Sequence, residues 1–149
     1  MGVYKAIDIA QFVIEKYEES GVKITNLGLQ KILFFIQWYF LKYHNKSCFE
    51  DKIEAWQYGP VVPSVYKECR SFGVNQFLIS VFNVGNSRNI TKNDRSEIEK
   101  VLEILKKYSA WDLVEMTHKE GGSWSKVNKY YEEIPIDLIK KDTTMELPK

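Results

Sequence analysis

The stretch from residue 27 to 43 constrains the fold most strongly, because it is apolar nearly all round a helix. Apolar residues recur at i, i+3, i+4 and i+7, with further aromatic residues between them: Leu29, Ile32, Leu33, Ile36, Phe40 and Tyr43, then Phe34, Phe35, Trp38 and Tyr39. Such a helix requires other elements around it. The run ILFFIQWYFL has about half the length that a bilayer requires, so we expect a central core helix.

The flanking patterns predict a mainly α-helical, compact single-domain bundle around that helix, covering residues 1–149. Amphipathic spacing predicts helices over 4–20, 63–72, 91–108, 109–117 and around 135–140. Thr91 with Asp94 and Ser109 with Asp112 have capping-box spacing. Short β elements are expected near 53–58, ended by Gly59-Pro60, and near 77–84. The tail from about 142 is expected to fray.

Composition restricts the class of partner. The formal net charge is +1 and the basic residues are spread along the chain, which argues against direct nucleic-acid binding. The N-terminal segment lacks the small-residue cleavage site of a signal peptide. Two cysteines in such a chain are most simply reduced thiols. We therefore expect a cytoplasmic protein that does not enter a membrane.

A metal site is one hypothesis, because His44 and Cys48 are four residues apart, the spacing of two ligands on one helical turn. Zinc requires three or four ligands, and the remaining soft candidates are Cys69 and His118. No CxxC, HxxxH or HExxH motif is present. The simpler interpretation is a surface histidine and two core cysteines, so no metal and no cofactor are expected.

A catalytic site is a second hypothesis, centred on His118, which lies between Thr117 and Glu120, with Cys69 or Ser64 as nucleophile. Nucleophilic catalysis needs the base within hydrogen-bond reach of the nucleophile. The sequence has neither a GxSxG nucleophile elbow nor a phosphate-binding loop. A histidine at a helix end, favoured there by the helix dipole, is the alternative. No catalytic residue is therefore expected.

Aromatic residues near prolines offer a binding surface instead. In EAWQYGPVVPSVYKECRSFG, residues 54–73, Pro60 and Pro63 fix the backbone angle φ and direct Trp56 and Tyr58. Together with Trp111 and Trp124 these side chains are candidate interface anchors, since tryptophan and tyrosine are enriched at binding hot spots. The alternative is that they are core residues or form only a rigid corner.

The same residues carry a resemblance to a known family, the SocA-like antitoxins with a Panacea domain. Residues 24–73 resemble its Leu-Gln-Lys-Leu-Leu helix, through Leu29, Gln30, Lys31, Ile32 and Leu33, and its following motif, through Glu54, Ala55, Trp56, Gly59, Pro60, Val61, Val62, Pro63 and Tyr66. The family's closing Leu-x-x-x-Thr-His…Pro-Trp segment is similar to Leu113, Thr117, His118 and Trp124. Ser123 replaces the usual proline, and we expect a more flexible loop there.

The resemblance spans roughly residues 4–140 and implies a helical, non-enzymatic module that binds and neutralises a toxin encoded next to it. We expect Trp56, Tyr58, Val61 and Trp124 as anchors. Lys31 and Glu54 either orient the partner or form an internal ion pair. The motif residues expected to matter are Lys31, Glu54, Trp56, Tyr58, Gly59, Pro60, Val61, Pro63, Tyr66, His118 and Trp124. The alternatives are a proteolytic adaptor that delivers its partner to a protease, a hydrolase using His118 with Cys69, and a DNA-binding regulator. The toxin and the oligomeric state are not specified by the sequence.

Overall fold

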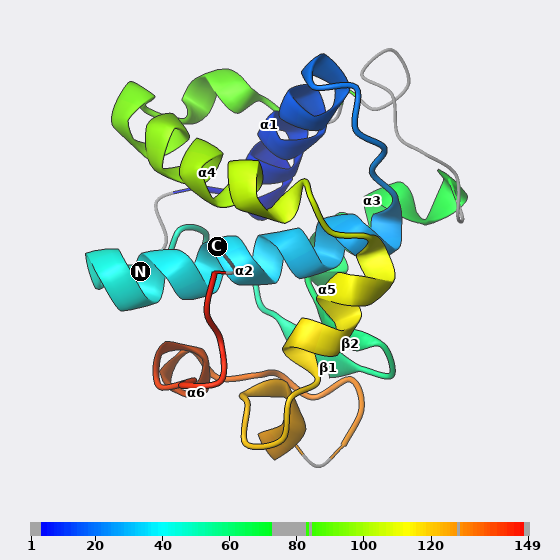
Figure 1. The fold of residues 1–149 in the computed structure, drawn as a ribbon, viewed down its shortest axis with the longest axis vertical. Coiled ribbons are helices and arrows are strands. Elements are labelled where there is room, and N and C mark those ends of the chain that lie inside the picture. The colour runs from blue at the N-terminus through cyan, green and yellow to red at the C-terminus, as the bar shows by residue number, and fades with distance from the viewer. Residues whose placement is uncertain (1–3, 73–82, 84, 128, 148–149) are drawn as a thin grey trace.

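Helices dominate the computed structural model, which describes residues 4–72, 83, 85–127 and 129–147 (Figure 1). The elements, in chain order, are α1 (Ala6–Glu19), α2 (Asn26–His44), β1 (Glu54–Trp56), β2 (Gly59–Val61), α3 (Pro63–Cys69), η1 (Arg70–Phe72), η2 (Ser87–Asn89), α4 (Lys92–Leu105), α5 (Ala110–Thr117), η3 (Trp124–Lys126) and α6 (Ile136–Lys140). The predicted mainly α fold with a minor β element is confirmed.

Helix α2 is the centre of the fold, as its apolar circumference predicts. It contacts α1, α3, α4, α5, α6 and strand β2. In Figure 1, α1 and α4 lie on one side of α2, and α6 and the hairpin lie on the other. The Thr25 side chain caps its N-terminus by accepting the Gly28 N–H, and Asn45, in the left-handed conformation with φ 53°, ends it.

Polar side chains on α2 are buried together with the apolar ones. Gln37 accepts the backbone N–H of Cys48 at 2.7 Å and donates to the Phe49 carbonyl at 2.9 Å. Gln30 accepts the Val62 N–H at 2.9 Å. Buried amides require such partners, and these bonds attach the following loops to the central helix.

The two predicted helix caps differ in detail. Ser109 and Asp112 form a complete capping box at the start of α5. At α4, Thr91 accepts the Asp94 N–H at 3.2 Å, but the Asp94 carboxylate accepts the hydroxyl of Tyr4 at 2.6 Å instead of closing a box. That bond ties the N-terminal segment to α4.

The β element is a hairpin, and the prediction for it needs one correction. Extended structure near 53–58 is present, but Gly59 and Pro60 lie inside strand β2 and do not end the element. The expected strand near 77–84 lies almost wholly outside the described residues. The predicted helix start at Pro63 is confirmed.

The C-terminal segment is packed against the molecule where we predicted fraying. Asp142 and Met145 are both buried, and Met145 belongs to the hydrophobic core. The Asp142 carboxylate accepts the N–H of Ser123 at 2.7 Å and its hydroxyl at 3.0 Å. A proline could not donate the first of these bonds, so Ser123 attaches this loop to Asp142 through hydrogen bonds instead of through a fixed proline angle.

Candidate functional site

The hairpin of β1 and β2 carries most of the motif residues. The hydrogen bonds that β1 makes on the side away from β2 explain why β2 can contain a proline. The register pairs Glu54 with Val61, Ala55 with Pro60 and Trp56 with Gly59. Ala55 uses its N–H and its carbonyl on the segment at 131–132, with N···O distances of 2.9 and 2.7 Å. Because Ala55 needs no donor from Pro60, the missing proline N–H leaves no bond unmade.

Gly59 allows the hairpin to lie directly on α2 and α5. Its φ is +114°, a backbone conformation that residues other than glycine rarely adopt. A Cβ there would lie 2.8 Å from Cε of Lys31 and 2.9 Å from Oγ1 of Thr117. The family glycine is therefore required both by backbone angle and by close approach.

Lys31 is buried beneath this turn, with 0% of its surface exposed. Its ammonium donates to the Pro60 carbonyl at 3.0 Å. Burial lowers the pKa of Lys31 to about 7. The internal ion pair with Glu54 does not form: Glu54 instead accepts the indole N–H of Trp56 at 2.9 Å.

His118 and Trp124 support the hairpin from below. Their rings stack at 3.9 Å with 12° between planes, and the Trp124 indole donates to the Trp56 carbonyl at 2.8 Å. Burial first, and then the positive charge of Lys31, lower the pKa of His118, so the neutral ring is favoured. Trp124, predicted as an anchor, thus uses its polar edge inside the molecule.

The remaining aromatic residues of the site reach the surface. Tyr58 is 49% exposed and meets Trp111, 57% exposed, edge to face at 5.4 Å. Trp56 lies between Tyr66 at 4.7 Å and Tyr131 at 5.2 Å. Val61, another predicted anchor, is buried. We refer to Trp56, Tyr58, Tyr66, Trp111 and Tyr131 as the aromatic face.

A pocket of about 460 Å³ opens within this face. Of the predicted site residues it is lined by Lys31, Trp56, Tyr58, Val61 and Tyr66. Six other lining residues were not predicted as site residues: Asn26, Leu27, Gln30, Gln57, Arg70 and Tyr131. Gln30 belongs to the motif helix and was the one recognisable signal. Tyr131 comes from a segment with no motif, and its own backbone has a φ of 71°.

The catalytic alternative has no support from its nucleophiles. Cys69 is fully buried, and burial raises the pKa of its thiol to about 12, which disfavours the thiolate. Ser64 donates its hydroxyl to Asp51 at 2.6 Å, so its proton is held by a different partner from His118. Neither nucleophile is shown in contact with His118.

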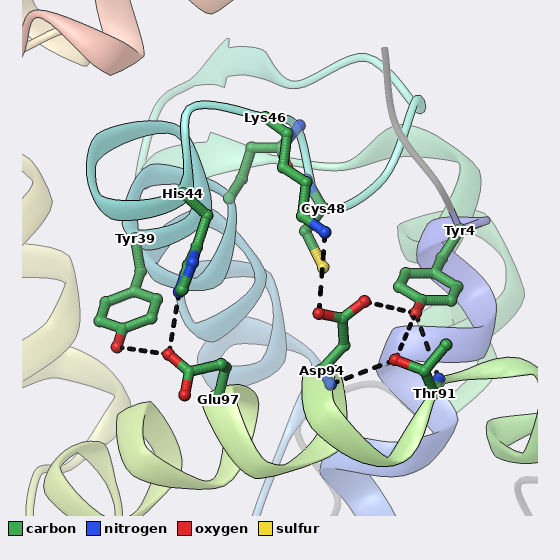
Figure 2. Close-up of polar contacts among 9 residues, drawn as sticks. Tyr4, Tyr39, His44, Lys46, Cys48, Thr91, Asp94 and Glu97 are labelled. Atoms are coloured by element: carbon green, nitrogen blue, oxygen red, sulfur yellow. Dashed lines mark hydrogen bonds and ion pairs between the residues drawn. The ribbon is translucent and has the colours of Figure 1, made fainter.

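The metal alternative is replaced by two groups of polar contacts made by α4, one at Glu97 and one at Asp94 (Figure 2). His44 contacts Glu97 at 2.9 Å, and the same carboxylate accepts the Tyr39 hydroxyl at 3.1 Å. Cys48 is buried, and burial raises its pKa. Across the described residues, no group of three or more His, Cys, Asp or Glu is arranged to hold a metal ion. Nor does that part of the chain contain a helix long and apolar enough to cross a bilayer.

Comparison with known proteins gives a family match. Residues 29–125 match the family described as "Antitoxin SocA-like, Panacea domain". The chain is 29% identical over 124 residues to Antitoxin SocA of Caulobacter vibrioides (strain NA1000 / CB15N), a match that covers 78% of this chain and 66% of that relative. The matched region is thus just under two thirds of that relative's length. No solved structure gives a significant match.

These matches confirm the resemblance drawn from the Trp-x-x-Gly-Pro-Val-Val-Pro motif. The matched range begins on α2 and ends at η3, so it contains the hairpin, Lys31, His118 and Trp124. The family description names an antitoxin, a non-enzymatic regulatory class, which agrees with the expectation that the chain is not an enzyme.

Proposed function

Because the chain belongs to the SocA-like antitoxin family with a Panacea domain, we propose that it is an antitoxin-type module that neutralises a toxin protein by direct contact. The observation that carries the proposal is the aromatic face, which brings exposed Tyr58, Trp111 and Tyr131 beside the family motif. Tyrosine and tryptophan are enriched among the few residues that carry most of the binding energy of an interface.

The aromatic face is continuous across three elements. Tyr58 on the hairpin turn contacts Trp111 on α5, and it shares the pocket with Trp56, Tyr66 and Tyr131. Tyr131 is 68% exposed, so its ring is available to a partner. A partner that covers this region together with its rim can reach the roughly 800 Å² per side of a stable interface.

The support beneath the face is rigid, which favours binding. Lys31 bonds the Pro60 carbonyl, Gln30 bonds the Val62 N–H, and Trp124 bonds the Trp56 carbonyl. These three bonds fix the hairpin on both sides of its turn. A surface that is ordered before binding loses less conformational entropy in the complex.

The proposal is tested by co-expression with the reading frame next to this gene. That product should be lethal alone and harmless with this chain, and the two proteins should co-purify. Two surface variants then locate the contact: Trp111→Ala should weaken protection, whereas Tyr43→Ala, which removes an equally exposed aromatic ring on α2, should not. Lack of protection by the wild-type chain would refute the antitoxin function.

The toxin level in the same co-expressing cells distinguishes direct sequestration from delivery to a protease. Under direct sequestration, an immunoblot should show a toxin level that is unchanged or higher while the cells survive. A toxin level that falls only when this chain is present would instead identify a proteolytic adaptor.

A further inference from the structure

The pocket in the aromatic face has the size and lining of a specific recognition site. Its volume of about 460 Å³ is within the range of typical ligand pockets. Trp56, Tyr66 and Tyr131 provide apolar ring surface, and Asn26, Lys31 and Arg70 provide hydrogen-bond donors. The lining combines α2, the hairpin, α3, η1 and Tyr131, so it exists only in the folded protein.

The charge of this pocket has one sign. Among the described residues its lining includes two basic side chains, Lys31 and Arg70, and no aspartate or glutamate. Burial lowers the pKa of Lys31 to about 7, so Arg70 is the group that stays charged at any pH near neutrality. Two other surface pockets are mixed: one combines Lys16 and Lys106 with Glu19, Glu99 and Glu103, and another combines Lys126 and Lys129 with Glu132 and Glu133. A pocket with cations alone is electrostatically complementary to an anion.

Several of its donors have spare capacity. The Lys31 ammonium has three donor hydrogens, and the Pro60 carbonyl accepts one of them. Asn26 uses its carbonyl oxygen to accept from Gln30 at 2.9 Å, which leaves its amide N–H groups. Within the described part of the chain, Arg70 is exposed and its guanidinium has neither an ion pair nor a hydrogen bond. Lys31 and Asn26 are buried, where unused donors favour a partner rich in acceptors, and Arg70 presents its donors at the surface.

We propose that this pocket receives an acidic segment of the toxin, in which an aromatic or aliphatic side chain packs against Trp56 and an adjacent carboxylate binds Arg70. This inference rests on the proposed antitoxin function and names the chemistry of the partner at that site. The guanidinium forms a bidentate pair with the carboxylate. Lys31 lies at the floor of the pocket and adds positive potential when it is protonated, and the apolar side chain fills the space between the rings.

A peptide titration tests the chemistry without the toxin. The probes are acetyl-Asp-Phe-Glu-amide and its neutral twin, acetyl-Asn-Phe-Gln-amide, added to the ¹⁵N-labelled chain. The acidic peptide should bind about tenfold more tightly than the twin, with the largest NMR shifts at the Trp56 indole and the Arg70 guanidinium. Equal binding of both peptides, no binding, or shifts centred elsewhere would overturn the proposal.

Matched arginine variants locate the charge. Arg70→Gln should reduce affinity for the acidic peptide about tenfold and leave the neutral twin unaffected. Arg88→Gln, at an exposed arginine of η2 that lines none of these pockets, should change neither affinity. Because both side chains are exposed, neither substitution removes core packing, and unchanged circular dichroism confirms that each variant is folded. A loss of the same size in both variants would refute a site at Arg70.

The co-expression assay separates this inference from the function on which it rests. If wild type and Arg88→Glu protect cells but Arg70→Glu does not, the pocket binds the toxin. If Arg70→Glu protects as well as wild type, the pocket inference fails while the antitoxin function stands. If wild type itself gives no protection, the antitoxin function fails, and the peptide titration alone decides whether the pocket binds acidic peptides.

Discussion

Substitution of Gly59 by alanine gives the sharpest test of how the hairpin is seated. Gly59 has a φ of +114°, and its missing Cβ would meet Cε of Lys31 at 2.8 Å and Oγ1 of Thr117 at 2.9 Å. Both neighbours are held in place. The Lys31 ammonium is bonded to the Pro60 carbonyl, and the Thr117 hydroxyl donates to the Val114 carbonyl at 2.9 Å. The added methyl group therefore displaces either a buried cation or a helix-end side chain.

Gly21 provides the matched control for the backbone part of this effect. Its φ is also positive, +69°, but a Cβ added there would have no atom within 4 Å. Gly21→Ala should cost about 1–2 kcal/mol of the free energy of unfolding, from the left-handed conformation alone. Gly59→Ala should lose about 1–3 kcal/mol of unfolding free energy to overpacking, in addition to the loss caused by its positive φ.

Urea unfolding followed by circular dichroism measures both variants. The midpoint should fall further for Gly59→Ala than for Gly21→Ala, with the slope m unchanged, because the surface exposed on unfolding is the same. A Gly59→Ala variant no less stable than Gly21→Ala would refute the close approach of the hairpin to Lys31 and Thr117.

Three further predictions concern buried groups. The folded protein releases the Lys31 proton at about pH 7 and the unfolded chain near 10.5, so wild-type stability should rise between these values relative to Lys31→Met. Measured by urea unfolding, the free energy of unfolding of the wild type should rise relative to the variant by up to about 1.4 kcal/mol per pH unit in this window. A difference between the two proteins that does not change with pH would contradict the lowered pKa of Lys31. At Asp142, burial alone would raise the pKa, but hydrogen bonds from Ser123 and Thr144 outweigh it and hold the pKa below its usual value. Asp142→Asn should therefore cost about 1.5–3 kcal/mol above pH 5, and this deficit should shrink in acid as the wild-type carboxylate is protonated; a deficit independent of pH would exclude a role for the charge. Cys48 and Cys69 are buried, so neither should react with an aromatic disulfide reagent in native buffer, while both should react in urea; rapid labelling of the native protein would show that the packing around them is wrong.

Local sequence patterns predicted much of the fold. The central helix is expected over 27–43 and runs from Asn26 to His44. The Ser109–Asp112 capping box and the helix start at Pro63 are also present as expected. These features depend on side chains no more than four residues apart, so their physics is contained in a short stretch of chain.

The candidate site was predicted only in part, because its contacts join distant segments. The motif placed Trp56 and Tyr58 on a stiffened loop, and the structure shows Tyr58 exposed beside Trp111. Arg70 and Tyr131 were missed because neither lies in a motif and their shared pocket is formed by packing. The Lys31–Glu54 ion pair was wrong because charge alone does not specify which acceptor a buried ammonium will reach.

The sequence by itself determined the helices, their caps and the family motif, since periodicity, capping and fixed proline angles act over a few residues. Tertiary structure decided which hydrogen-bond partners the polar residues of these helices and of the motif find. Lys31 finds its acceptor 29 positions away at Pro60, and Trp38 donates its indole N–H to a carbonyl 104 positions away. Burial forces each polar group to find a partner, and which partner lies within reach depends on how the helices pack.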